Sequence, residues 1–201
     1  MIIERVINQI FTSNTYLLHQ DGRLDYWLVD IGDIEPVTRF LTERHLSVAG
    51  VFLTHAHFDH IYGLEALVDR FPECKVYVCE YAKQALASEK LNMSKYHGTP
   101  INFTSDNVIV VREGDIMPLF AGEPELEFYE TPGHNPGCLT MVLGDVIFTG
   151  DAYIPSVGVN TKLPKADKEL ANKSLERIMI LSKEKKILSD HQVLYFHNNL
   201  N

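Results

Sequence analysis

Three histidines and an aspartate within six residues limit the fold of this chain more than any other feature. The apolar segment at residues 51–54 has the composition of a strand buried in an α/β sheet. Directly after it come His55, His57, Asp59 and His60, in the pattern His-x-His-x-Asp-His. On a tight turn, alternating side chains can converge on one face and offer imidazole nitrogens to zinc or a similar cation. Because the whole chain has only 9 histidines, this density predicts a metal site at a strand end rather than a chance surface cluster.

Three later segments place further metal-binding residue types after expected strands. His134 lies in a loop at residues 131–138 that is fixed by two glycines and two prolines. Asp151 ends the sequence Thr149-Gly150-Asp151, and His191 follows a short apolar run at residues 187–188. Taken alone, each of these residues is more readily an ordinary turn or surface residue than a metal ligand. Their weight as metal ligands comes from their combination with the first cluster.

The pattern of strands and helices predicts a mixed α/β sandwich built from two similar halves. Expected strands, rich in β-branched and aromatic residues, lie at residues 2–7, 15–19, 26–31, 51–54, 76–78, 108–111, 126–130, 138–143, 146–149 and 187–188. Expected helices lie at residues 36–46, 62–70, 81–88 and 168–182. Residues 88–105 are expected to form an extended loop. In the last helix, the side chains expected to face the core are Leu170, Leu175, Ile178, Met179 and Leu181.

Composition narrows the class of protein further. A chain of 201 residues with 45% hydrophobic residues predicts one globular domain over residues 1–201. Its formal net charge of -9 disfavours a nucleic-acid partner, because an acidic surface repels phosphate backbones. No run is long and apolar enough for a membrane helix, and the first residues do not resemble a signal peptide. With 3 widely spaced cysteines, the chain is expected in the reducing cytoplasm.

Together, the four segments resemble the metallo-β-lactamase superfamily, and the form with both Asp59 and His60 is closest to its glyoxalase II-like branch. The resemblance implies an α/β fold that is a four-layer αββα sandwich, with two mixed sheets and helices on both outer faces. It also implies two metal sites and a carboxylate that bridges them. The implied ligands are His55, His57 and His134 for the first metal, Asp59, His60 and His191 for the second, and Asp151 for the bridge.

The activity implied is that of a metal-dependent hydrolase with two zinc ions, cleaving a small-molecule thioester, ester or lactone by metal-activated hydroxide. Asp59 and Asp151 would be the catalytic carboxylates that orient the hydroxide. An alternative on the same scaffold is a persulfide-dioxygenase-like enzyme with one non-haem iron, so that Fe²⁺ or a mixed Zn/Fe centre is the alternative to two zinc ions. A domain that only binds a partner is disfavoured, because all seven positions carry competent ligands. Nothing in the sequence indicates an oligomeric state.

Two departures from the family pattern bear on the site. His191 lies in the sequence Ser189-Asp190-His191 instead of a Pro-Gly-His-Gly loop, so Asp190 is a candidate to orient His191. The sequence also ends at Asn201, without the helical carboxy-terminal domain with which full glyoxalase II enzymes hold glutathione. Glutathione thioesters are therefore not expected to be the native substrate.

Substrate contacts must then come from loops, and residues 88–105 form the longest irregular stretch. Its candidate substrate-binding residues are Lys95, Tyr96 and His97, whose donors and positive charge would suit a carboxylate or phosphate on the substrate. A simple connecting loop is the equally weighted alternative.

Overall fold

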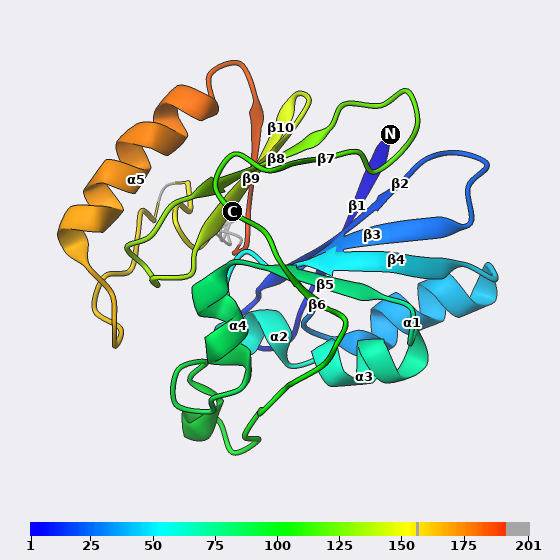
Figure 1. Cartoon of the computed structure of the whole chain (residues 1–201), viewed down its shortest axis with the longest axis horizontal. Coiled ribbons are helices and arrows are strands. Elements are labelled where there is room, and N and C mark those ends of the chain that lie inside the picture. Colours follow the sequence, from blue (N-terminus) through cyan, green and yellow to red (C-terminus); the bar gives the residue numbers. More distant parts are fainter. Residues whose placement is uncertain (156, 192–201) are drawn as a thin grey trace, which may run out of the picture.

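Two β-sheets packed face to face form the centre of this computed structural model, which describes residues 1–155 and 157–191 (Figure 1). The first sheet has six strands in sequence order: β1 (Ile2–Ile7), β2 (Asn14–His19), β3 (Asp25–Val29), β4 (Ser47–Phe52), β5 (Lys75–Val78) and β6 (Val108–Val110). The second has five strands in the reverse order: β11 (Lys186–Ser189), β10 (Val146–Gly150), β9 (Leu139–Leu143), β8 (Leu126–Glu130) and β7 (Ile116–Met117).

Both sheets are mixed, as predicted. In the first sheet, β1, β2 and β3 pair antiparallel, and β3 to β6 pair parallel. In the second sheet, β7 to β10 pair antiparallel, whereas β11 joins β10 in parallel. A parallel pair needs a crossover connection, and helices supply it in both sheets.

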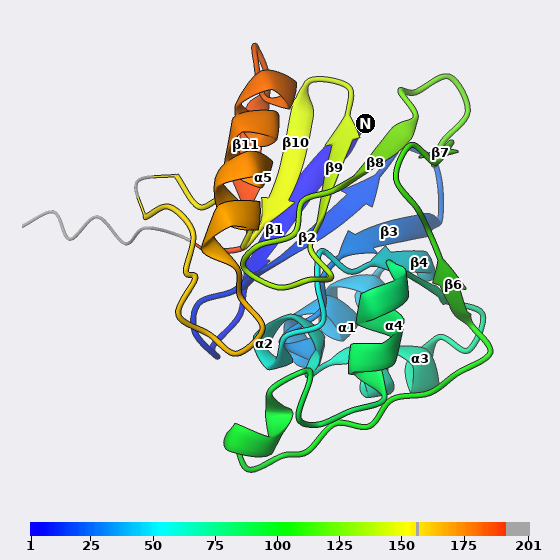
Figure 2. The ribbon, with the colours of Figure 1, turned by 60° about the vertical axis from the view of Figure 1, so that its left-hand side comes forward.

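The helices complete the four layers (Figures 1 and 2). On the outer side of the first sheet lie α1 (Ile34–Glu43), α3 (Leu64–Arg70) and α4 (Glu80–Leu86), together with the single turn of α2 (Phe58–Ile61). On the outer side of the second sheet lies α5 (Lys168–Leu181). The predicted αββα sandwich is confirmed. Across the described ranges, no helix has both the length and the apolar character needed to cross a membrane.

Aromatic side chains fill the space between the sheets. Phe52 on β4 faces Phe128 on β8, with ring centroids 5.7 Å apart. Tyr16 on β2 meets the edge of Phe148 on β10 at 5.4 Å. All four side chains are buried, and rings of this size contribute most to the apolar area that stabilises such a core. The inward-facing positions of strands far apart in sequence therefore hold the two halves together.

The buried face of α5 differs from the predicted one. Ala171, Ser174 and Ile178 are buried, whereas Leu170 and Met179 are 40% and 42% exposed. The prediction that these two large residues belong to the core was wrong. Of the other residues expected there, Leu175 and Leu181 are only half-buried.

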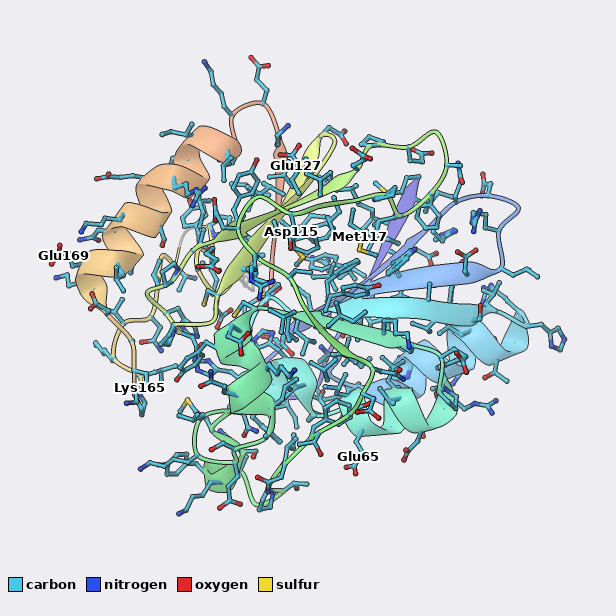
Figure 3. The ribbon with its side chains drawn as sticks, in the orientation of Figure 1. Glu65, Asp115, Met117, Glu127, Lys165 and Glu169 are labelled. Atoms are coloured by element: carbon cyan, nitrogen blue, oxygen red, sulfur yellow. The ribbon has the colours of Figure 1, made fainter. Side chains whose placement is uncertain are left out.

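A close approach between α5 and the β8–β9 loop explains this choice of face. A Cβ atom added to Gly133, which has φ +144°, would lie 2.3 Å from the Cα atom of Ala171. The Ser174 hydroxyl donates to the Pro132 carbonyl at 2.6 Å. Asp167 caps the first turn, from which Glu169 points away from the body of the molecule (Figure 3). Small side chains on α5 therefore let the helix support the loop that carries His134.

We expect Gly133→Ala to reduce the free energy of unfolding by about 3 kcal/mol or more, since it combines backbone strain with overlap against α5. Gly114→Ala is the matched control, because Gly114 also has a positive φ of 81° but no atom within 4 Å of the added Cβ. Its expected cost is about 1 kcal/mol. Urea denaturation of the two variants measures the difference, and equal losses would contradict the proposed role of the close approach.

Candidate metal centre

All seven predicted metal ligands lie where strands of both sheets end, at one edge of the sandwich. The segment after β4 carries four of them, and the β8–β9 loop and the ends of β10 and β11 carry one each. The seven residues are His55, His57, Asp59, His60, His134, Asp151 and His191. They divide into two groups of three and one carboxylate between the groups.

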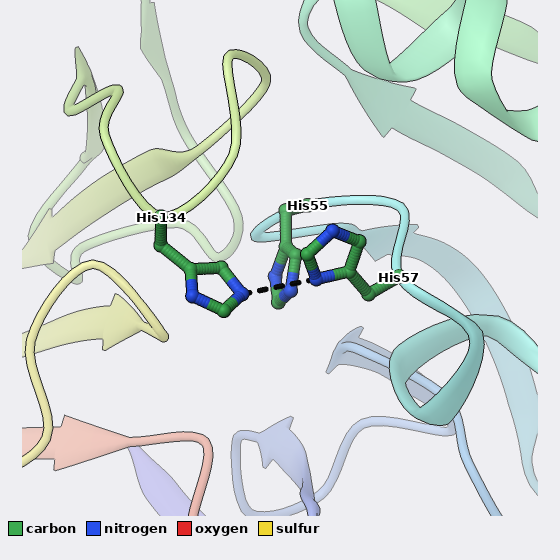
Figure 4. A group of neighbouring side chains, drawn as sticks. All are labelled: His55, His57 and His134. Carbon is green, nitrogen blue, oxygen red and sulfur yellow. Dashed lines mark hydrogen bonds between the residues drawn. The ribbon is translucent and has the colours of Figure 1, made fainter. Parts of the chain in front are cut away.

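The first group consists of His55, His57 and His134 (Figure 4). One ring nitrogen from each of these buried residues lies within 4.8 Å of the other two. The closest pair is His134 Nε2 and His57 Nδ1, which lie 2.9 Å apart. On its other side, the His134 ring donates from Nδ1 to the Asn160 carbonyl at 3.0 Å, which leaves Nε2 facing the group. Three converging imidazoles form the donor set that zinc and similar cations bind.

The second group consists of Asp59, His60 and His191, again with donor atoms within 4.8 Å of one another. Asp59 Oδ2 lies 3.2 Å from His60 Nε2 and 3.3 Å from His191 Nε2. The His191 ring is fixed by its Nδ1–H, which donates to the Phe11 carbonyl at 2.9 Å. This arrangement directs the remaining nitrogen of His191 into the group.

Asp151 lies between the two groups. One carboxylate oxygen is 3.3 Å from His134 Nε2 in the first group, and the other is 3.3 Å from His191 Nε2 in the second. Asp151 follows directly on β10, and the residue is 8% exposed. A carboxylate that faces both groups has the position that a bridging ligand requires.

Buried polar residues behind the centre orient two of the histidines. His60 Nδ1 lies 3.1 Å from Asp30 Oδ2, and His55 Nδ1 lies 3.1 Å from the Thr54 hydroxyl oxygen. These partners favour a proton on Nδ1 of each ring and so leave Nε2 directed toward the centre. His55 Nε2 has no hydrogen-bond partner within the described residues, and His60 Nε2 faces only the Asp59 carboxylate of its own group. Because a buried donor or acceptor without a partner is costly, the position of His55 Nε2 fits a site that binds a metal.

Asp190 turns toward these residues rather than toward His191. Its Oδ2 atom lies 2.7 Å from the Thr54 hydroxyl oxygen and 3.5 Å from His60 Nδ1. Burial and the negative charge of Asp30 raise the pKa of Asp190 well above its usual range. Asp190 is also close enough to His55 and His60 to form a third possible donor group. However, its contact with Thr54 places it behind the histidines, on the side of their Nδ1 atoms.

The two main groups differ in their protonation state at neutral pH. Burial lowers the pKa of His57 to about 3, and burial with the neighbouring His60 lowers the pKa of His55 well below its usual range. In the second group, burial opposes the charge on His191, but contacts with Asp151 and Asp59 outweigh it and raise the pKa to about 10. The first group is therefore neutral and ready to bind a cation at neutral pH, whereas the second holds protons that a cation must displace.

A cavity of about 420 Å³ opens over this centre. Of the predicted substrate-binding residues, Tyr96 and His97 line the cavity, whereas Lys95 is exposed to solvent and does not line it. The predicted positive charge from the 88–105 loop is therefore not in the cavity. The lining residues that sequence reasoning missed are Phe11, Phe58, Met93, Asn160 and Leu163. Phe58 lies inside the histidine motif and Met93 lies in the 88–105 loop, so both could have been proposed, whereas Phe11, Asn160 and Leu163 lie on other loops without a motif.

Comparison with known proteins identifies the family of the chain. The model of the family described as the metallo-beta-lactamase superfamily matches residues 10–191. A hydroxyacylglutathione hydrolase of Psychromonas ingrahamii is 28% identical over 200 residues, which cover 98% of this chain and 68% of that relative. The chain thus spans about two thirds of the length of this relative.

Two solved structures are similar over almost the whole chain. The crystal structure of BLEG-1 B3 metallo-beta-lactamase is 27% identical, with a TM-score of 0.83 over 96% of this chain and 92% of that one. The structure of TTHA1623 in a di-iron-bound form is 26% identical, with a TM-score of 0.79 over 94% of this chain and 92% of that one. The chain therefore belongs to the metallo-β-lactamase superfamily, and its relatives place it among the hydrolases of that superfamily.

Proposed function

We propose that this protein is a hydrolase with a two-metal centre that cleaves a thioester, ester or lactone. The observation that carries the proposal is the presence of two donor groups that share no residue, with Asp151 facing both. His55, His57 and His134 would hold one ion, and Asp59, His60 and His191 the other. We propose zinc as the metal, since imidazole and carboxylate are common zinc ligands. Such a pair of ions lowers the pKa of a water molecule and polarises the carbonyl oxygen of the substrate.

The residues of the chain supply position and charge for this reaction. The His60 and His191 rings outweigh the effect of burial and hold the pKa of Asp59 below its usual range, so its carboxylate is ionised. Asp151 is ionised for a similar reason, because His191 and His60 lower its pKa against burial. Both carboxylates line the cavity, where they can accept hydrogen bonds from an attacking water and orient it. We therefore propose Asp59 and Asp151 as the catalytic carboxylates.

The relatives favour a thioester among the three bond types, because the Psychromonas protein is named a hydroxyacylglutathione hydrolase. A small molecule is the substrate that a cavity of about 420 Å³ can accept. Two assignments of the metal are supported. Two zinc ions suit the donor set, while the similarity to a structure with bound di-iron supports Fe²⁺ or a mixed Zn/Fe centre as the alternative.

A mononuclear iron enzyme of the persulfide-dioxygenase type is the second candidate reaction. It would need the first group alone, formed by His55, His57 and His134. The second group favours hydrolysis, because Asp30 holds His60 in the orientation of a ligand and the Phe11 carbonyl does the same for His191. Oxygen consumption with a persulfide substrate would distinguish this reaction from hydrolysis.

We expect His55→Ala to lower the bound metal by about one equivalent or more and to reduce activity at least about 100-fold, since the first group loses a donor. His45→Ala is the control, because His45 is an exposed histidine outside the centre. Metal content by mass spectrometry and circular dichroism would be measured on both variants. Full metal content in His55→Ala would refute its role, and a lost fold would show that His55 is structural.

The binding of each metal ion is expected to release a different number of protons. His55 and His57 are neutral at pH 7 because their pKa values are lowered, whereas His191, with a pKa of about 10, carries a proton. Titrating the metal-free protein with Zn²⁺ should therefore release at least one more proton with the second equivalent than with the first.

Calorimetry in buffers with different ionisation enthalpies counts these protons. The affinity for the second equivalent should fall about tenfold or more for each pH unit below 8, because protons then compete with the metal. The affinity for the first should change much less over pH 6–8, since the pKa of His57 lies near 3. Equal proton release in the two steps would contradict the assignment of the groups.

A further inference from the structure

We propose that the cavity over the metal centre selects an uncharged substrate with an apolar acyl group, and that Phe11, Phe58 and His97 form the wall that binds this group. The inference rests on the proposed function, since it names the substrate class of the same site. It differs from what the sequence predicts, because Lys95 was expected to provide a positive charge for an anionic substrate.

Three aromatic rings from separate segments form one continuous wall. The rings of Phe58 and His97 are stacked, with centroids 4.8 Å apart and an interplanar angle of 2°. Phe11 makes an edge contact with His97, with centroids 5.2 Å apart and an interplanar angle of 75°. All three side chains line the cavity. Phe58 lies between His57 and Asp59 in the sequence, so the wall begins directly beside the metal-binding residues.

The remaining apolar lining comes from Met93, Tyr96 and Leu163. None of the described residues that line the cavity is a lysine or an arginine. The whole chain has a net charge of -9. A substrate with several carboxylates, such as a glutathione thioester, finds neither a lysine nor an arginine there to offset the loss of its hydration.

Two residues that line the cavity present aromatic surface to solvent. Phe11 is 57% exposed and Tyr96 is 60% exposed. The loop that carries Phe11 is closed by a hydrogen bond of 2.7 Å from the Asn8 amide to the Ser13 carbonyl. A second bond of 2.7 Å joins the Gln9 amide to Asp33. Exposed aromatic side chains on a fixed loop beside a cavity are typical of a surface that binds an apolar ligand.

The test uses zinc-loaded protein and two kinds of thioester. The first kind is a series of N-acetylcysteamine thioesters with acetyl, butanoyl and hexanoyl groups, which are uncharged and differ only in apolar length. The second is S-lactoylglutathione. We expect kcat/KM to rise about tenfold or more from acetyl to hexanoyl, because each added methylene gains contact with an apolar pocket. We also expect the hexanoyl thioester to exceed S-lactoylglutathione in kcat/KM.

Phe11→Ala removes one ring of the wall and keeps the backbone carbonyl that accepts from the metal-binding residue His191. It should reduce the hexanoyl-to-acetyl ratio of kcat/KM at least about threefold, with metal content unchanged. The matched control is Leu24→Ala, because Leu24 is 65% exposed and does not line the cavity. His97→Ala should lower the same ratio, since it removes the ring that joins Phe11 to Phe58.

A binding measurement separates this inference from the proposed function. A ketone isostere of the hexanoyl thioester, with CH₂ in place of sulfur, resists hydrolysis and should bind both zinc-loaded and metal-free protein in calorimetry. Phe11→Ala should weaken that binding at least about threefold, and Leu24→Ala should not.

The outcomes are distinct. Preference for S-lactoylglutathione, or a flat chain-length series, would overturn the apolar specificity and leave the hydrolase intact. If zinc-loaded protein hydrolysed no ester or thioester, the proposed function would be overturned. Calorimetric binding of the ketone would then test the apolar specificity on its own. Binding that depends on Phe11 would support it, and absence of binding would refute it.

Discussion

The hydroxyl of Thr54 joins the two halves of the molecule, and the metal centre depends on this junction. Its oxygen contacts Asp30 from the end of β3 at 2.8 Å and Asp190 from the end of β11 at 2.7 Å. The Thr54 carbonyl accepts a bond of 2.7 Å from the Leu139 amide of β9. Thr54, two residues after the end of β4, is thus bonded to the second sheet through both its main chain and its side chain.

Burying two carboxylates side by side is costly unless their charge is reduced. A hydroxyl has one proton, so Thr54 can donate to only one of the two aspartates, and the other must carry its own proton. We assign this proton to Asp190, because Asp30 already accepts from the Thr54 amide and from His60 and because burial and Asp30 raise the pKa of Asp190; Asp190 then donates to Thr54. Asp30 stays available for the Nδ1–H of His60 and for the Thr54 amide, at 3.1 and 2.8 Å. The same arrangement leaves the Thr54 oxygen able to accept from His55 Nδ1.

Close packing at this junction also requires a glycine. A Cβ on Gly150 would lie 2.8 Å from the Thr54 side chain and 3.0 Å from Asp190. Gly150 therefore allows the end of β10 to approach the junction and places Asp151 at the centre. Strand ends from both sheets, rather than any single loop, fix the positions of the metal-binding residues. This explains how a chain can hold seven ligand side chains in place with four short segments.

The sequence predicted most strands and the candidate ligands, because strand patterns and strand-end motifs are local signals. It missed β7, which has only two residues, and the short helical turn at Ser94–Tyr96 inside the expected loop. The error on Leu170 and Met179 has a different cause, since periodicity favours large apolar residues and gives no sign that a glycine loop requires small ones. The roles of Asp30 and Thr54 were also hidden, because their partners come from strands more than twenty residues away.

Anomalous diffraction at the zinc absorption edge would test the two-metal centre most directly. Crystals of the protein grown with Zn²⁺ should show two peaks. One should lie among His55, His57 and His134, and the other among Asp59, His60 and His191, with Asp151 beside both. A single peak in the first group, or a peak among His55, His60 and Asp190, would contradict the two-metal centre.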